Sequence, residues 1–138
     1  MPRTIVITGC STGFGYDAAL RFARNGDRVY ATMRGVDGKN QGPAGELRQA
    51  AADEGIDIRV LEMDVSSDAS VNAAAETVLA ESGAPYAVIN NAGQMYMGLT
   101  EAFTADELAW QLDVNVVGIH RVNRAFLPAM REKGDGCL

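Results

Sequence analysis

The sequence predicts an α/β fold with a doubly wound parallel sheet. Short apolar runs rich in β-branched residues alternate along the chain with longer segments of helical periodicity. The first run, Thr4–Thr8, passes directly into a glycine-rich loop and then into an amphipathic segment. The composition is globular, with 47% apolar and 22% charged residues, and 138 residues suffice for one domain with a core. We therefore expect one Rossmann-type domain over residues 1–138 with strand order 3-2-1-4.

Four strands are expected where apolar residues cluster between turn signals. They are expected at Thr4–Thr8, Arg28–Met33, Ile56–Met63 and Tyr86–Asn90. In the third of these, Ile56, Ile58 and Val60 alternate with polar residues, which is the period of a strand.

The first two helices follow the first two strands. The first covers about Gly13–Asn25 and ends at Gly26, a residue type favoured just after a helix. The second starts near Pro43, which suits a first helical turn, and continues to about Glu54.

The third helix is expected to begin at a cap formed by Ser66 or Ser67. Its apolar face consists of Val71, Ala74, Ala75 and Val78. The fourth is long, capped by Thr104 and reaching about Lys133.

The glycine loop after the first strand is a candidate anion site. Its spacing is Gly-x-x-x-Gly-x-Gly, with glycines at Gly9, Gly13 and Gly15. Glycines let the backbone approach a pyrophosphate, and the following helix offers free N–H groups and the positive end of its dipole. The alternative is that Gly9 serves only a tight turn. The loop predicts that the chain holds a nucleotide.

Three further motifs occur downstream in a fixed order. Asp64-Val65 follows the third strand, Asn90-Asn91-Ala92-Gly93 follows the fourth, and Asn115-Val116-Val117-Gly118 lies within the long helix. With the glycine loop, they resemble the short-chain dehydrogenase/reductase family over the whole chain from Thr4 onward. The resemblance implies binding of NAD or NADP and hydride transfer between the nicotinamide and an alcohol or carbonyl carbon.

The resemblance also implies residue roles. The three loop glycines would form the pyrophosphate turn, Asp64 would accept from the adenine amino group, and Asn115 would help hold a proton-relay water. Asn90 and Gly93 would line the cofactor floor. The full set of expected cofactor-binding residues is Gly9, Ser11, Thr12, Gly13, Phe14, Gly15, Arg34, Asp64, Val65, Asn90, Ala92 and Gly93. The alternatives are a plain loop carboxylate at Asp64 and a simple turn at residues 90–93.

Asn115 also has a physical argument of its own. It falls in an apolar stripe of the long helix formed by Leu108, Leu112, Ile119, Val122, Phe126 and Met130. Burying an amide without partners costs about 1–3 kcal/mol. Asn115 is therefore expected to have partners, which either a structural network or a catalytic relay supplies.

The end of the second strand favours NADP over NAD. NAD-binding domains place an acidic residue there for the ribose hydroxyls, whereas this chain has Met33, which cannot accept those hydrogen bonds. Arg34 follows, and a guanidinium pairs well with a 2′-phosphate. Thr12 adds no second positive charge. NAD remains the alternative, in which Arg34 stacks on the adenine or points to solvent.

The tyrosine and lysine that supply acid/base chemistry in the family are not found at their spacing of four. Four residues after the tyrosines at positions 16, 30, 86 and 96 stand Leu20, Arg34, Asn90 and Thr100. Of the usual catalytic residues only Asn115 is present. We expect a domain incomplete at the C-terminus, truncated after the fourth helix and inactive alone, with the fourth strand's edge and the fourth helix's stripe exposed.

Two other function classes remain open at this stage. One is a non-catalytic nucleotide-binding module. The other is a truncated paralogue that docks on full-length partners through the fourth helix. The substrate expected by resemblance is a small alcohol or carbonyl compound, with a homo-oligomer in the full-length form.

Charge and composition argue against several partners. The net charge of −6 argues against nucleic acid, and no apolar segment is long enough to span a bilayer. His120 is the single histidine, so no Cys/His cluster has metal-ligand spacing and no metal site is expected; His120 itself is expected to be a surface or half-buried helix residue. The two cysteines, Cys10 and Cys137, fit a reducing cytoplasm, and Cys10 has no base nearby to make it a nucleophile.

Overall fold

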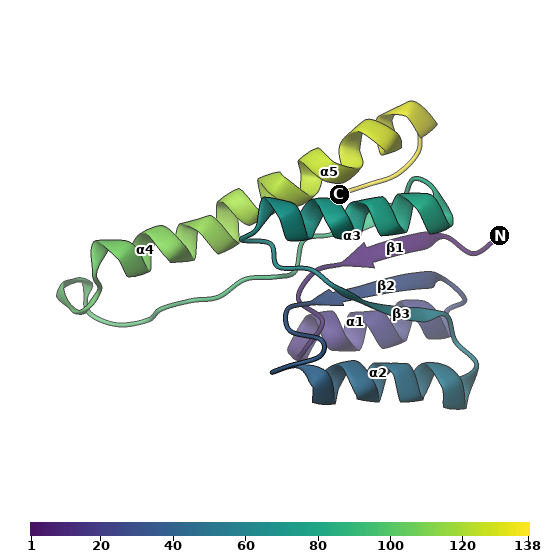
Figure 1. Ribbon diagram of the computed structural model, residues 1–138, viewed down its shortest axis with the longest axis horizontal. Coiled ribbons are helices and arrows are strands. Elements are labelled where there is room, and N and C mark those ends of the chain that lie inside the picture. Colours follow the sequence, from purple (N-terminus) through teal and green to yellow (C-terminus); the bar gives the residue numbers. More distant parts are fainter.

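The computed structural model describes residues 1–138 and contains a four-stranded sheet between two layers of helices (Figure 1). The strands are β1 (Thr4–Ile7), β2 (Arg28–Met33), β3 (Ile58–Glu62) and β4 (Ala87–Ile89). Their order is β3-β2-β1-β4, and every pair is parallel. This confirms the predicted doubly wound α/β fold with strand order 3-2-1-4.

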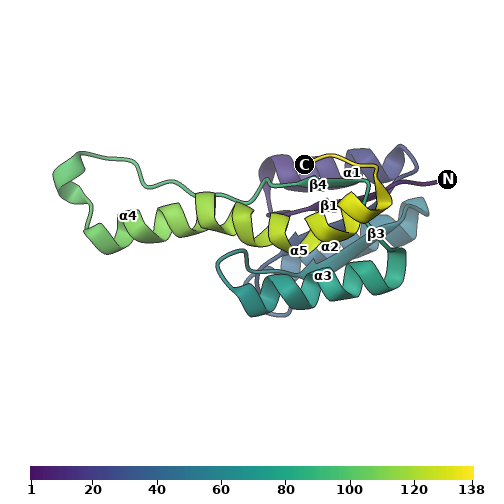
Figure 2. The same ribbon diagram turned by 90° about the horizontal axis from the view of Figure 1, so that it is seen from above.

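The helices divide between the two faces of the sheet (Figures 1 and 2). One face is covered by α1 (Gly13–Arg24) and α2 (Gln41–Glu54). The other is covered by α3 (Asp68–Ser82) and α5 (Gly118–Lys133). The remaining helix, α4 (Ala105–Leu112), extends beyond the end of the sheet in both views.

The alternation of side chains along β1 separates the two cores. Ile5 and Ile7 pack with α1 and α2, whereas Val6 packs with α3 and α5. All three are almost completely buried. A strand between two helical layers therefore reads as a continuous apolar run, because both of its faces are covered.

Three strands are shorter than their apolar runs, and α2 is longer than predicted. Pairing ends at Ile7 in β1, covers Ile58–Glu62 in β3 and covers Ala87–Ile89 in β4. The residues that follow still make single ladder contacts, such as Thr8 N–H to the Ile89 carbonyl (3.0 Å). The strands end there because the chain turns out of the sheet. Helix α2 begins at Gln41, ahead of Pro43.

Helices α1 and α3 end and begin where the sequence predicted. Gly26 follows α1 in a left-handed conformation (φ +91°), and Ser67 caps α3 by accepting from Ser70 N–H (3.3 Å). The predicted apolar face of α3 is buried: Val71, Ala74, Ala75 and Val78.

The predicted long helix is interrupted. Thr104 caps α4 through a reciprocal capping box with Glu107, as the sequence indicated for its start. After Leu112 the chain forms one π turn, η2 (Asp113–Val117), before α5 begins. A π turn shifts the register of a helix, so residues before and after it do not share one straight face.

This shift and the projection of α4 divide the apolar stripe. Val122, Phe126 and Met130 are buried on α5, although the whole stripe was expected to be exposed. Leu108 and Leu112 are instead 55% and 50% exposed, because α4 lies beyond the sheet. The expected exposure of this stripe is therefore found in its first half, and the second half is buried instead.

The edge of β4 is only partly open. After α5 the chain returns, and Cys137 forms a parallel bridge with Ala87. Val88 N–H donates to the Cys137 carbonyl (3.1 Å), and Cys137 N–H donates to the Tyr86 carbonyl (2.9 Å). These bonds cover part of the edge that the sequence led us to expect exposed.

Buried Thr8 joins the ends of β1 and β4. Its hydroxyl oxygen accepts from the N–H groups of Asn91 (3.1 Å) and Ala92 (2.9 Å). The same hydroxyl is within 3.4 Å of the Ile89 carbonyl, to which it donates. The segment that leaves β4 is thereby fixed against the loop that leaves β1.

Replacing Thr8 with valine keeps the shape and removes the acceptor. We expect Thr8→Val to lower the free energy of unfolding by about 1–3 kcal/mol, since the Ala92 N–H loses its partner. Urea denaturation measures this. The control is Thr77→Val, which removes an exposed helical hydroxyl bond to Ala73 and should cost less than about 0.5 kcal/mol. Equal stability of the two variants would contradict the assignment.

Candidate cofactor-binding site

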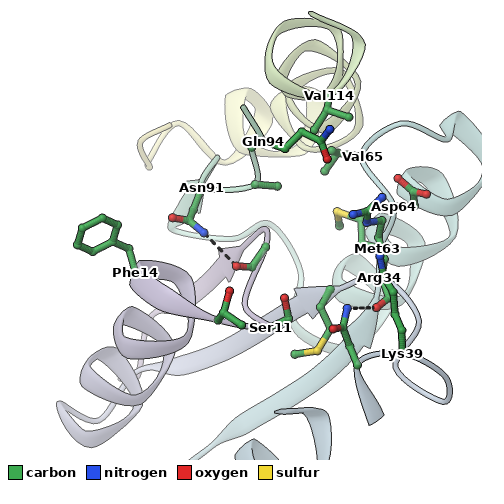
Figure 3. Close-up of a pocket in the computed structure, with 16 residues that line it drawn as sticks. Ser11, Phe14, Arg34, Lys39, Met63, Asp64, Val65, Asn91, Gln94 and Val114 are labelled. Atoms are coloured by element: carbon green, nitrogen blue, oxygen red, sulfur yellow. Dashed lines mark hydrogen bonds between the residues drawn. The ribbon is translucent and has the colours of Figure 1, made fainter. Parts of the chain in front are cut away.

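A pocket of about 330 Å³ lies at the carboxyl ends of the strands (Figure 3). Segments that follow all four strands line it, including Gly9 after β1, Arg34 after β2, Asp64 after β3 and Asn91 after β4. This is where ligands bind in open parallel sheets, because the loops diverge there. Its position agrees with the predicted nucleotide site.

The glycine loop is shaped by close packing against the segment after β4. Gly9 has φ +73°, and a Cβ there would lie 2.8 Å from the Ala92 Cα. A Cβ at Gly15 would lie 2.5 Å from the Asn91 Nδ2 atom. Gly13 adopts φ +60°. Gly13 and Gly15 do not line the pocket, so they contribute by shaping the loop.

The amino end of α1 opens into the pocket. Thr12 stands at the N-cap with extended backbone, its side chain caps nothing, and the first turn has no acidic residue. Ser11 and Thr12 line the pocket beside this end. Phe14 also borders it, but its ring is largely exposed and points away from the other lining residues (Figure 3). The first-turn N–H groups therefore lack side-chain acceptors and are available to an anion.

Asn91 is a site residue that the sequence analysis missed. Its side-chain amide donates to the carbonyls of Thr8 and Gly9, both at 3.0 Å, and it lines the pocket. The predicted neighbour Asn90 does not line the pocket. It donates instead to the Asn123 Oδ1 atom on α5 (2.9 Å) and so ties the sheet to that helix. The sequence signal that could have identified Asn91 is its place next to Asn90 in the Asn90-Asn91-Ala92-Gly93 motif.

Asp64 and Val65 form one wall after β3. Asp64 Oδ1 accepts from the Ser66 N–H (2.9 Å) and hydroxyl (2.6 Å), and no protein group donates to Oδ2. Partial burial raises the pKa of Asp64, but the Ser66 hydrogen bonds and the charges of Arg34 and Lys39 outweigh it and hold that pKa below its usual value. The carboxylate is thus ionised with one oxygen free to accept.

The wall after β2 contains Met33 and Arg34, with the Met33 side chain buried. Arg34 is half-buried, and its guanidinium has no carboxylate within 4 Å. Asn40 donates to the Arg34 carbonyl (2.5 Å), which fixes the backbone beside that side chain. Lys39 and Asn40 line the pocket too, and the sequence analysis did not select either.

Asn115 has the partners that its position required. Its Oδ1 accepts from Gln94 N–H (2.8 Å), and its Nδ2 donates to the Gln94 carbonyl (2.6 Å). It lies behind the pocket wall formed by Gly93 and Gln94 and does not itself line the pocket. These two bonds form a structural network, which clasps the segment after β4 to the π turn η2, and the relay role of Asn115 stays a prediction.

Arg121 also holds the π turn η2 in place, and the sequence analysis did not select it. It forms an ion pair with Asp113 at the start of η2 (2.7 Å) and donates to the Val65 carbonyl (3.1 Å). Its side chain is only 16% exposed. Because the pair is eight residues apart across an irregular turn, regular helix spacing does not reveal it.

Cys10 lies beneath the loop as an inert thiol. Burial raises its pKa to about 12, and its Sγ donates to the Ile7 carbonyl (3.3 Å). A thiol this basic is not a nucleophile near neutral pH, in agreement with the sequence analysis. His120 is exposed, as predicted. None of the helices combines the length and apolar character that a bilayer crossing requires.

A parallel sheet of this order, with a glycine loop and an open helix end at its carboxyl edge, is typical of Rossmann-type α/β domains. The family model for short chain dehydrogenase matches residues 3–138. The chain belongs to this family.

Relatives place the chain within that family. It is 42% identical over 140 residues to 17-beta-hydroxysteroid dehydrogenase type 1 of Homo sapiens, covering 99% of this chain and 42% of that protein. A short-chain dehydrogenase from Streptomyces avermitilis superposes with TM-score 0.86 at 31% identity, covering 99% of this chain and 47% of the other. The structure of gluconate 5-dehydrogenase from Burkholderia cenocepacia in complex with NADP and tartrate superposes with TM-score 0.83 at 30% identity. This match covers 97% of this chain and 51% of the other. The chain spans about half the length of these proteins.

The ionised state of Asp64 predicts a pH-dependent stability. Its folded pKa lies below the ordinary value, so its contribution is present above about pH 4 and is lost as pH falls through the folded pKa. We expect Asp64→Asn to be less stable than the wild type at pH 7, and the difference to shrink by pH 3. Urea denaturation at both pH values tests this. Asp37→Asn, at an exposed position without hydrogen bonds, should change stability little, and a constant gap for Asp64→Asn would refute the account.

The Asn115 clasp predicts local protection of Gln94. In Asn115→Leu both Gln94 hydrogen bonds are lost, so we expect its amide proton to exchange about tenfold faster or more. Hydrogen exchange followed by NMR measures this. His120→Leu, exposed on the adjoining helix α5, is the control and should leave that rate unchanged. Unaltered exchange in Asn115→Leu would mean that other contacts hold the segment.

Proposed function

We propose that this chain forms the cofactor-binding part of an NADP-dependent oxidoreductase that transfers hydride between nicotinamide and an alcohol or carbonyl carbon. The observation that carries the proposal is the pocket between the open end of α1 and the Arg34 wall. Family membership supports the reaction class, and similarity to a structure that holds NADP supports the cofactor. When bound, the nicotinamide supplies or accepts the hydride.

Different residues of the pocket are proposed to bind different parts of the cofactor. In this proposal the Gly9–Gly15 loop and the first turn of α1 hold the pyrophosphate through backbone N–H groups. The free Oδ2 of Asp64 accepts from the adenine amino group, with Val65 beside it. Ala92 and Gly93 form the floor, and Asn90 supports it through Asn123.

Cofactor choice is assigned to the end of β2. Met33 offers no acceptor to the ribose hydroxyls, and the unpaired Arg34 guanidinium suits a 2′-phosphate. We therefore favour NADP, with NAD as the alternative. Among the residues predicted from the sequence, only the charged Arg34 supports the choice of NADP over NAD.

Asn115 is proposed as a residue that positions the segment beside the nicotinamide and a relay water. Its amide is engaged with Gln94, so it acts through that backbone. The proton that accompanies hydride transfer needs an acid/base group, and none of the four tyrosines lines the pocket. We therefore propose that these 138 residues do not turn over substrate alone.

Oligomeric state, cellular location and substrate class are also proposed. The exposed apolar residues Leu108, Leu112, Val116 and Val117 on α4 and η2 support a homo-oligomer of the full-length protein. Free Cys10 and Cys137 support a cytoplasmic location. The relatives named above support a small alcohol or carbonyl substrate.

Arg34→Asp tests the assignment. It places a carboxylate where ribose hydroxyls would bind and repels a 2′-phosphate, so we expect NADPH affinity to fall by about 100-fold or more and NADH affinity to change far less. Fluorescence titration of both cofactors against the purified chain measures this. Equal loss for both would remove the NADP assignment, and no binding of either by the wild type would remove the cofactor site.

A further inference from the structure

The loop after β2 folds back on itself. Gly38 N–H and Asn40 N–H both donate to the Gly35 carbonyl, at 3.0 and 2.9 Å. The Asn40 side chain then reaches the Arg34 carbonyl. Residue 39 is thereby returned to the neighbourhood of residue 34, on the same wall of the pocket (Figure 3).

This loop is anchored to the adjacent strand. The Glu62 carboxylate, at the end of β3, accepts from Gly35 N–H and Val36 N–H, both at 2.8 Å. Val36 is buried against the core that contains α1 and α2. Two charge-assisted hydrogen bonds and a buried side chain hold the loop in place, so the wall is preformed.

Gly35 leaves room for the Lys39 side chain. It has φ +61°, and a Cβ built on it would lie 3.2 Å from the Lys39 Cγ atom. The aliphatic stem of Lys39 therefore lies across the bare Gly35 backbone. The stem is guided toward the pocket, and the ammonium is left at its exposed rim.

Arg34 and Lys39 are the two cations that line this pocket. Five other basic residues are held in ion pairs, namely Arg3, Arg24, Arg28, Arg59 and Arg121. The remaining five, which form no ion pair and do not line this pocket, are Arg21, Arg48, Arg124, Arg131 and Lys133. Neither pocket cation has a carboxylate within 4 Å, although both lower the pKa of nearby Asp64. In a chain of net charge −6, two unpaired cations on one wall mark a place for an anion of more than one charge.

We propose that Lys39 is a second specificity determinant, which acts with Arg34 on the 2′-phosphate of the adenosine ribose. The proposal rests on the proposed binding of NADP and deepens it. Arg34 offers a planar fork of donors, and Lys39 adds a compact charge from the rim. Together they match a phosphate monoester, which carries close to two negative charges at neutral pH. Lys39 supplies the second positive charge that Thr12 does not.

The test uses the full 138-residue chain and two probes that need no turnover. Adenosine 2′,5′-bisphosphate carries the 2′-phosphate, and adenosine 5′-monophosphate lacks it. By calorimetry we expect Lys39→Met to weaken the bisphosphate about tenfold and to leave the monophosphate within about twofold. Lys39→Arg should restore most of the bisphosphate affinity. Lys133→Met, the same change at the far end of α5, is the control and should alter neither.

The outcomes separate this inference from the function on which it rests. If the wild type binds neither probe, the nucleotide site and the role of Lys39 both fall. If it binds both probes equally, the NADP assignment falls, and Lys39 with it. If the wild type prefers the bisphosphate and Lys39→Met keeps that preference, Arg34 suffices and only the inference about Lys39 is overturned. If Lys133→Met lost as much bisphosphate affinity as Lys39→Met, the effect would come from net charge and the inference about Lys39 would be overturned.

Discussion

The site depends on how backbone polar groups are satisfied where β1 and β4 leave the sheet. Beyond Ile7 and Ile89 the strand ladder ends, and buried N–H and C=O groups need other partners. Thr8 accepts from two N–H groups of the β4 segment, and Asn91 donates to two carbonyls of the β1 segment. These reciprocal bonds draw the two loops so close that the contact positions tolerate only glycine. The glycine loop thus takes its shape from strand-end hydrogen bonding rather than from the glycines alone.

The same segment is held from its other side by the irregular turn η2. Asn115 binds the Gln94 backbone through both ends of its amide, as a neighbouring strand would. Arg121 pairs with Asp113 and binds the Val65 carbonyl, so it links this turn to the Asp64 wall. The pocket floor and one wall are therefore fixed to one helical element. Changes at η2 are transmitted to the pocket through these bonds, although neither Asn115 nor Arg121 lines it.

The parts predicted from the sequence are those set by local pattern. Strand order and helix caps followed from apolar periodicity and from cap residues such as Thr104, since each depends on a few neighbouring residues. The π turn and the division of the apolar stripe into an exposed half on α4 and a buried half on α5 did not follow, because both depend on where α4 lies relative to the sheet. Lys39 was missed because its place in the pocket depends on a folded loop anchored by Glu62, which is distant in sequence.

Electrostatics explain how an acidic chain is suited to a polyanion. The net charge of −6 repels an anion at a distance, but at about 0.1 M salt this repulsion is largely screened beyond about 10 Å. In the proposed function, the groups that a bound phosphate would meet are local: uncapped N–H groups at α1 and two cations without carboxylate partners. The nearest acid, Asp64, has one oxygen occupied by Ser66, and its charge is partly balanced by those cations. Keeping Arg34 and Lys39 out of ion pairs leaves their donors available to the ligand, while the remaining surface stays acidic.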